Sequence, residues 1–163
     1  MTESPSNVDE NAVGREAFMH RLDRVVLADV KKAWAQYQST RDRSAIYAYL
    51  HMVFMQVDWW KKNAVDRKVD IAAFQAKNPA VRLPADDFAV VIACSTDPTK
   101  VNGKMRSKRG RVLKYCAESK PKEELLRDFV QRKGGINRCA GRYARRLRRT
   151  HRCGKRNSDL SSL

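Results

Sequence analysis

Apolar residues at helical spacing constrain the fold of the first half of the chain. In residues 15–38, and again in residues 46–60, they recur at intervals of three and four, which places them on one face of a helix. A short polar break at residues 39–43 separates the two segments. We therefore expect an N-terminal antiparallel helix hairpin whose apolar faces meet each other or a shared third element. Residues 1–14 have little to bury and are expected to be a disordered lead-in.

Helix signals after this hairpin are short. Residues 70–76 fit a helix that ends at Asn78, because the residue before a proline disfavours helical geometry. A proline and two aspartates within residues 84–87 form a helix start, with the carboxylates at the positive end of the helix dipole. The apolar run 88–94 fits a buried strand or a buried helix, and this start favours the helix. We expect residues 15–97 to form a neutral helical region for packing and assembly.

The charge of the chain is concentrated near its C-terminal end. The 34 Lys and Arg and the 18 Asp and Glu give a formal net charge of +16. Residues 1–100 hold 14 basic and 13 acidic side chains, a net of +1, whereas residues 101–163 hold 20 and 5, a net of +15. A block of one sign is typical of an interaction surface, and nucleic acid is the commonest partner of a polycation. We expect a basic helical nucleic-acid-binding region at 98–150 and a flexible basic tail at 151–163.

Three helices are expected in this basic region. The first buries a face formed by Met105, Val112, Leu113 and Cys116. The second begins at Pro121, with two glutamates in its first turn, and ends in basic residues just before Gly134; these are standard start and stop signals. Its buried residues are expected to be Leu125, Leu126, Phe129 and Val130. The third begins at Ile136 or Asn137 and buries a stripe formed by Ile136, Ala140, Tyr143, Ala144 and Leu147.

The third helix carries an unusual density of arginine. Residues 136–156 contain nine basic side chains and no acidic one. Arg138, Arg142, Arg145 and Arg149 follow one another at intervals of four, three and four, so they form a ridge opposite the buried stripe. Like charges at this spacing destabilise an isolated helix by a few tenths of a kcal/mol per pair. A negatively charged partner is therefore expected to offset the repulsion.

Residues 103–149 loosely resemble the helix-turn-helix family of DNA-binding domains. The resemblance rests on three short helices, a glycine turn in residues 129–140 and a last helix that is both anchored and basic. In that family the last helix enters the major groove with its N-terminal side chains at base edges. Carried over by position, the residues that would face bases are Asn137, Arg138, Gly141, Arg142 and Arg145. Those expected nearer to phosphates are Lys108, Arg111, Arg146, Arg148 and Arg149.

The full set of candidate nucleic-acid contacts is larger than the set implied by the helix-turn-helix resemblance. It adds the other basic side chains of the first helix and one residue of the tail, namely Lys104, Arg106, Arg109, Lys114 and Arg152. Guanidinium binds phosphate through two parallel hydrogen bonds and can also reach guanine in the major groove. An arginine-rich helix with a basic tail would also fit a folded RNA. The structural alternative is two packed helices with an exposed basic side.

Enzymatic motifs are absent from the sequence. It contains no phosphate-binding loop of the GxxxxGK[ST] type, no HExxH, no GxSxG and no glycine-rich dinucleotide turn. His20 and His51 fall within the two expected long helices. Asp66, Asp70 and the pair at 86–87 would allow a metal-dependent nuclease, but a polar helix surface and a helix start explain them better. We expect no enzyme activity and no cofactor.

The cysteines also argue against a metal site. Cys94, Cys116, Cys139 and Cys153 are widely spaced, without a CxxC pair, whereas small zinc domains use two close pairs of ligands. The only close pair of possible ligands is His151 with Cys153. We expect reduced, half-buried thiols and no bound metal.

Aromatic residues are concentrated in the two long helices. Their helical spacing favours core packing over stacking platforms for bases. Trp59 and Trp60 are adjacent, so they lie about 100° apart around a helix, and both are buried only if the apolar face is broad. One of them is a candidate anchor for a homodimer or a larger protein complex.

These observations predict an all-α protein with a non-enzymatic role. We expect a DNA-binding regulator or accessory factor, such as those of mobile elements. The alternatives are an RNA-binding subunit of a ribonucleoprotein and a module that docks its basic tail on an acidic protein. The sequence has no apolar stretch of membrane-spanning length and no secretory signal, so an intracellular location, cytoplasmic or nucleoid-associated, is expected.

Overall fold

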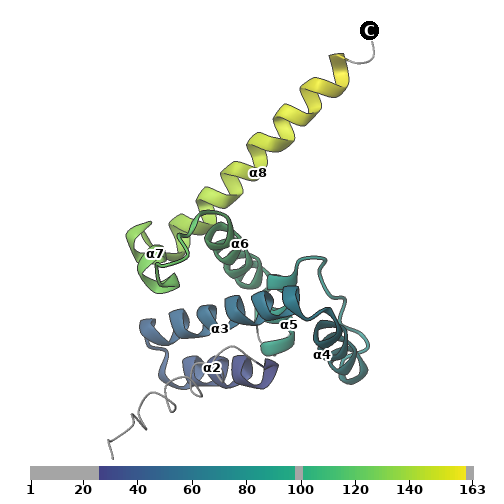
Figure 1. Cartoon of the computed structure of the whole chain (residues 1–163), viewed down its shortest axis with the longest axis vertical. Helices are drawn as coiled ribbons and strands as arrows, with labels where there is room; N and C mark the ends of the chain where they lie inside the picture. The colour runs from purple at the N-terminus through teal and green to yellow at the C-terminus, as the bar shows by residue number, and fades with distance from the viewer. Residues whose placement is uncertain (1–25, 98–100, 161–163) are drawn as a thin grey trace, which may run out of the picture.

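The computed structural model describes residues 26–97 and 101–160 of the chain, with side chains up to Thr150. These residues form seven helices and no strand, which confirms the all-α prediction (Figure 1). The helices are α2 (Leu27–Thr40), α3 (Arg43–Lys62), α4 (Ala64–Lys77), α5 (Asp87–Ser95), α6 (Gly103–Ser119), α7 (Leu126–Arg132) and α8 (Gly135–Leu160). The expected lead-in 1–14 and the first part of the first expected helix, 15–25, lie outside the described residues.

Helices α2 and α3 pack side by side through their apolar faces (Figure 1). Only Arg41 and Asp42 separate them, and Arg41 adopts the left-handed conformation with φ 50° as its N–H bonds the carbonyl of Tyr37. The side chains of Val30, Tyr49 and Leu50 are fully buried at this contact. Helix α3 is longer at both ends than the predicted segment 46–60.

Helix α4 is twice as long as the sequence indicates. It begins at Ala64 instead of residue 70, and it ends at Asn78 as expected. Its acidic side chains accept hydrogen bonds from α3, because the indole N–H of Trp59 donates to Asp66 and that of Trp60 donates to Asp70, both at 2.9 Å. Trp60 is buried and Trp59 packs against the core, so the apolar face of α3 is broad enough for both. A homodimer through this region stays a prediction.

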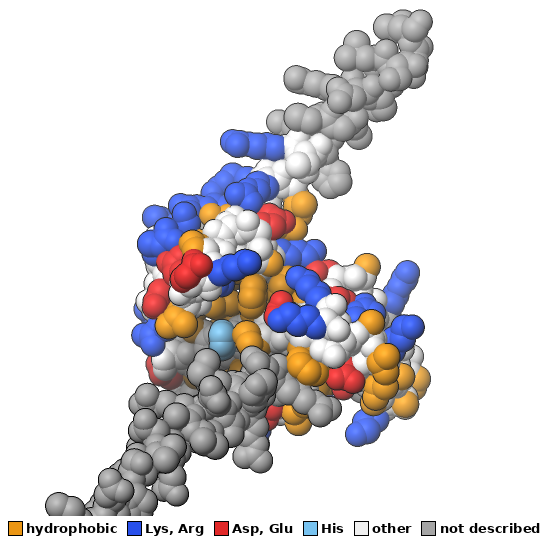
Figure 2. Space-filling model, viewed as in Figure 1, with side chains coloured by type: hydrophobic (Ala, Val, Ile, Leu, Met, Phe, Trp, Pro, Cys, Tyr) orange, Lys and Arg blue, Asp and Glu red, His pale blue; other side chains and the backbone are white. Residues whose placement is uncertain are grey.

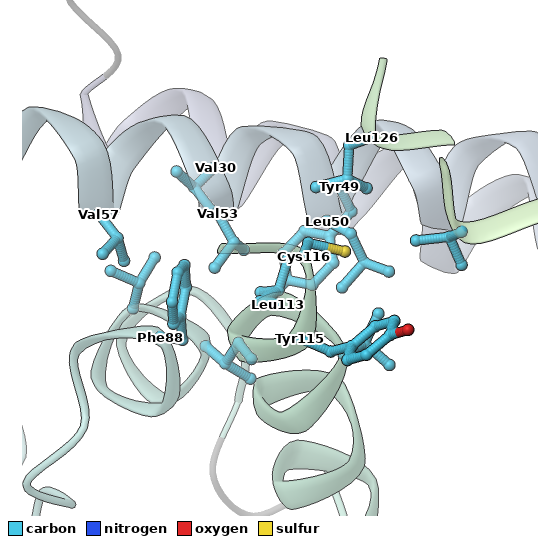
Figure 3. Close-up of a cluster of buried hydrophobic side chains, with 14 of the residues drawn as sticks. Val30, Tyr49, Leu50, Val53, Val57, Phe88, Leu113, Tyr115, Cys116 and Leu126 are labelled. Carbon is cyan, nitrogen blue, oxygen red and sulfur yellow. The ribbon is translucent and has the colours of Figure 1, made fainter. Parts of the chain in front are cut away.

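Helix α5 is the most apolar helix of the fold. The carboxylate of Asp86 accepts the N–H of Ala89 and caps the start of the helix, as the sequence indicates. The side chains of residues 88–95 are buried, apart from partly exposed Ala89, so the apolar run 88–94 is a helix and not a strand. Phe88 and its neighbours point towards the same interior as Val53 and Leu113 (Figure 3).

One hydrophobic core joins the neutral and basic parts of the chain. The same cluster contains Leu50 and Val57 of α3, Leu113 of α6, Phe129 of α7 and Tyr143 of α8 (Figure 3 shows several of these contacts). Helix α3 contacts both α6 and α7, and α5 contacts α6. The division of charge along the sequence is therefore not a division of the core.

Helix α7 starts later than predicted. The sequence indicates a start at Pro121, but the helix begins at Leu126 and Leu125 is exposed at its N-terminal boundary. The ammonium of Lys120 bonds the carbonyls of Pro121 and Glu124 at 2.8 and 2.7 Å, which holds this segment as a turn. The Glu124 carboxylate binds the Arg132 guanidinium at 2.6 and 2.8 Å, and this contact holds the pKa of Glu124 below its ordinary value. Glu124 thus connects the turn before α7 to the last residue of that helix, and it does not lie within the helix.

The thiols that the structure describes are free and buried. Cys94, Cys116 and Cys139 form no disulfide, as expected, although they are more deeply buried than the sequence suggests. Burial raises the pKa of Cys94 and of Cys116 to about 12. Cys153 lies outside the side chains that are described. These three thiols pack as small apolar groups.

The turn between α7 and α8 depends on glycine. Gly134 and Gly135 have φ of 92° and 89°, and a Cβ on Gly134 would overlap the side chain of Arg138. We expect Gly134→Ala to lower the free energy of unfolding by about 1 to 2 kcal/mol, because an L-residue is strained at positive φ. Chemical denaturation measures this change. Gly103→Ala is the control, because Gly103 has open space around it and starts α6. Equal losses of stability in the two variants would contradict the requirement for glycine at position 134.

Candidate nucleic-acid interface

Helix α8 is anchored by its first half and projects from the helical body (Figure 1). Cys139, Ala140 and Tyr143 are buried against α6 and α7, which holds this part of the helix in place. Leu147, expected on the buried stripe, is 41% exposed. The helix continues to Leu160, into the segment 151–163 for which the sequence predicts a flexible tail; that flexibility stays a prediction.

Four arginines of α8 meet at one side of the helix, and we call this set with Tyr115 the arginine groove. It is a hollow of about 220 Å³ lined by Tyr115, Arg142, Arg145, Arg146 and Arg149. Figure 2 shows Lys and Arg side chains gathered over α7 and the adjoining half of α8. Three members of the predicted ridge thus lie together in the folded chain. The fourth, Arg138, is exposed and its side chain folds back over Gly134.

Arg146 is the member of the groove that the protein itself holds. Its guanidinium lies 5.5 Å from the centre of the Tyr115 ring and 3.0 Å from the Glu118 carboxylate, and it also bonds the hydroxyl of Ser119 at 3.2 Å. Tyr115 is buried beneath it. These contacts fix one wall of the groove on α6, so the groove is a property of the α6 and α8 pair.

The other three arginines of the groove have no acidic partner among the described residues. Arg142, Arg145 and Arg149 form none of the ion pairs found in that part of the chain. Their charges lie close together and repel one another, so an anion in the groove would relieve the repulsion. Guanidinium groups in this arrangement can bind phosphate oxygens through paired hydrogen bonds.

A second basic hollow lies on the other side of the contact between α6 and α8, and we call it the α6 cleft. Its volume is about 610 Å³. The basic side chains that line it are Arg82, Arg106, Arg111 and Lys114. The ammonium of Lys114 lies 3.3 Å from the carboxylate of Asp86, so one of the four charges is already paired. Arg82 precedes α5 in the neutral part of the sequence, and no sequence signal singled it out.

Arg109 is the one candidate residue that the structure removes from this surface. The sequence places it among the nucleic-acid contacts, but its side chain is only 4% exposed. Its guanidinium lies over the rings of Trp34, Tyr37 and Tyr49. It occupies the α6 position that packs on α2, whereas Met105, expected to be buried, is 46% exposed. The prediction for Arg109 was wrong because charge alone does not reveal which side of α6 faces α2.

The remaining candidates are scattered around the two hollows. Lys104 and Lys108 are exposed on α6, and Asn137 is exposed near the start of α8. Arg148 is exposed on α8 but is not among the residues that line the arginine groove. Gly141 is half-buried. The last candidate, Arg152, lies outside the described side chains.

The described residues show neither a metal centre nor a membrane span. No group of three His, Cys, Asp or Glu side chains within them is arranged to hold a metal ion. None of the helices in the described ranges is long and apolar enough to cross a membrane. The aspartates considered for a nuclease are engaged elsewhere: Asp66 and Asp70 accept the tryptophan N–H groups, and Asp87 binds Arg67 at 2.7 Å.

Comparison with protein-family models, curated proteins and solved structures finds no match to this chain.

Proposed function

We propose that this protein is a non-enzymatic DNA-binding regulator or accessory factor, and that α8 is its binding helix. The observation that carries the proposal is the arginine groove, in which Arg142, Arg145 and Arg149 lie together without a carboxylate among the described residues. A cluster of cations that the fold leaves unneutralised favours an anionic partner. Nucleic acid supplies closely spaced phosphates, which such a cluster can bind bidentately.

Duplex DNA suits a helix that projects from its body. The major groove of B-DNA is about 12 Å wide and admits one α-helix. The α6 cleft and the arginine groove flank α8 on two sides. We propose that Arg106 and Arg111 on one side and Arg149 on the other contact phosphates beside the inserted helix. We propose that Arg145, exposed on the outer part of α8, contacts phosphate together with Arg142 and Arg149.

Salt dependence tests whether the groove binds a phosphate backbone. We expect the plot of log affinity against log salt concentration to have a slope of about −2.7 or steeper. Each phosphate contact contributes about −0.9, and the groove supplies three contacts. Between 50 and 200 mM salt, affinity for a duplex of about 20 base pairs should then fall at least roughly fortyfold. Fluorescence anisotropy of a labelled duplex measures both values. A slope near zero contradicts the proposal.

Competition identifies the kind of partner. The labelled duplex is displaced with unlabelled duplex or with a structured RNA hairpin of equal phosphate number, at physiological salt. The DNA proposal expects the duplex to compete better. Stronger competition by the hairpin would instead support the RNA-binding alternative, and binding to neither would favour an acidic protein partner.

A further inference from the structure

The strongest unexplained feature outside α8 is the environment of Arg109. This side chain is 4% exposed, yet none of the carboxylates in the described ranges pairs with it. Its guanidinium carbon lies 4.8 Å from the ring centre of Trp34, 5.5 Å from that of Tyr37 and 5.9 Å from that of Tyr49. Aromatic faces attract the cation and offset part of the loss of hydration.

The ring contacts do not satisfy all the hydrogen-bond donors of this guanidinium. Its Nη1 atom is buried and has no hydrogen-bond partner. The donors of arginine lie in the plane of the group, whereas ring faces interact from above and below that plane. A buried donor without an acceptor costs about 1 to 3 kcal/mol, and more when it is charged. Burial also lowers the pKa of Arg109 from its ordinary value, because loss of hydration disfavours the charged form.

Arg109 lines a hollow between α2 and α6 that we call the Arg109 pocket. Its volume is about 610 Å³, within the usual range for pockets that bind small molecules. Its walls combine aromatic and apolar side chains with polar ones, two cations and one carboxylate, that of Asp97. They consist of Trp34, Tyr37, Gln38, Arg41, Asp97, Val101, Asn102, Met105 and Arg109. Arg41, at the C-terminal end of α2, adds a second cation at this pocket. None of these residues belongs to the arginine groove or to the α6 cleft.

We infer that the Arg109 pocket binds a small organic anion, with a carboxylate or phosphate oxygen at the Arg109 guanidinium and a planar apolar body against Trp34 and Met105. The oxyanion supplies the in-plane acceptor that the fold omits, and it neutralises the buried charge. The apolar walls supply the area that a planar body buries. Arg41 provides further attraction for the anion.

Calorimetric titration with three probes of similar size tests this inference. Benzoate and phenyl phosphate carry the oxyanion on a planar ring, and benzyl alcohol is the neutral match. At least one anion is expected to bind with a Kd on the order of 0.1 to 1 mM, as befits a ligand of this size. Benzyl alcohol should bind at least tenfold more weakly. Absence of saturable binding by both anions, or equal binding of the alcohol, overturns the inference.

Two variants locate the site. Arg109→Met keeps the apolar volume and removes the donors, so it should weaken the better anion at least tenfold. Arg41→Met changes an exposed residue and should weaken it about threefold, which keeps the test valid if the buried substitution prevents folding. Lys68→Met removes an exposed cation from α4, outside this pocket and both basic hollows, and should leave anion binding unchanged. Unchanged binding in both Arg109→Met and Arg41→Met overturns the site.

A nucleic-acid phosphate would have the same chemistry as the free anion. If it were the natural occupant, Arg109→Met would weaken duplex binding, and the duplex would displace phenyl phosphate. We expect neither effect, because the Arg109 pocket and the arginine groove share no residue. Displacement of phenyl phosphate by the duplex overturns the assignment to a small molecule. If the unsubstituted protein binds phenyl phosphate but no duplex, the result counts against the proposed function alone.

Discussion

Replacing Arg142, Arg145 and Arg149 together by alanine is expected to reduce affinity for duplex DNA on the order of a hundredfold at 100 mM salt. The three side chains line the arginine groove and have no acidic partner among the described residues, so each is free to contact a phosphate. Losing three contacts should make the slope of log affinity against log salt shallower by about 2.7. Anisotropy titrations at several salt concentrations give both quantities.

The matched control removes the same charge elsewhere. Lys32 on α2 and Lys68 and Lys77 on α4 are exposed, so their triple alanine variant also lowers the net charge by three. It should keep the slope and lose affinity only a few-fold. Helical circular dichroism should be preserved in both variants, since alanine favours helix and fewer like charges reduce repulsion in α8. Equal losses in the two variants would show that net charge, and not the groove, determines binding.

Replacing Trp60 by alanine is expected to lower the free energy of unfolding by about 3 to 5 kcal/mol. Trp60 is 1% exposed in the core, and its indole N–H donates to Asp70, which connects α3 to α4. The substitution removes buried aromatic area, leaves a cavity and breaks this link. The melting temperature should fall by about 10 °C or more in a chain of this size. Urea denaturation and thermal unfolding measure the two effects.

Leu125→Ala is the control for this prediction. Leu125 is 66% exposed, so its truncation should change stability by no more than about 0.5 kcal/mol. The sequence predicts that Leu125 is buried. If Leu125→Ala lowered the free energy of unfolding by several kcal/mol, that prediction would hold and the exposed position in the structure would be wrong. A loss below about 1 kcal/mol for Trp60→Ala would mean that the contact between α3 and α4 contributes little to the fold.

Local signals explain which parts of the fold were predictable. A proline and two aspartates indicate a helix start at residues 84–87, and a helix begins there at Asp87. Pro84 lies before its first turn, and the carboxylate of Asp86 caps it by accepting the N–H of Ala89. The end of α4 at Asn78 follows from the proline after it. The same kind of signal failed at Pro121, where Lys120 and Arg132 draw the turn into side-chain contacts that a helix-start pattern does not contain.

The candidate site was predictable only as a density of charge. Arg142, Arg145 and Arg149 follow one another at intervals of three and four, which places them on one side of a helix. The structure brings these residues together. Tyr115 on α6 and Arg82 before α5 line the two hollows from outside α8, so no pattern within α8 could indicate them. Arg109 was misassigned for the same reason, because its burial depends on aromatic side chains about sixty or more residues earlier in the sequence.

The sequence by itself determined the helical class, most helix positions and the concentration of positive charge after residue 100, because helical spacing, caps and charge are local properties. Only the tertiary structure decided which of those charges face solvent. Helix α6 has cations on several sides, and aromatic side chains of α2 and α3 bury Arg109 while Lys104 and Lys108 stay exposed. Burial depends on contacts between segments distant in sequence, so the same residue type forms a binding surface at one position and part of the core at another.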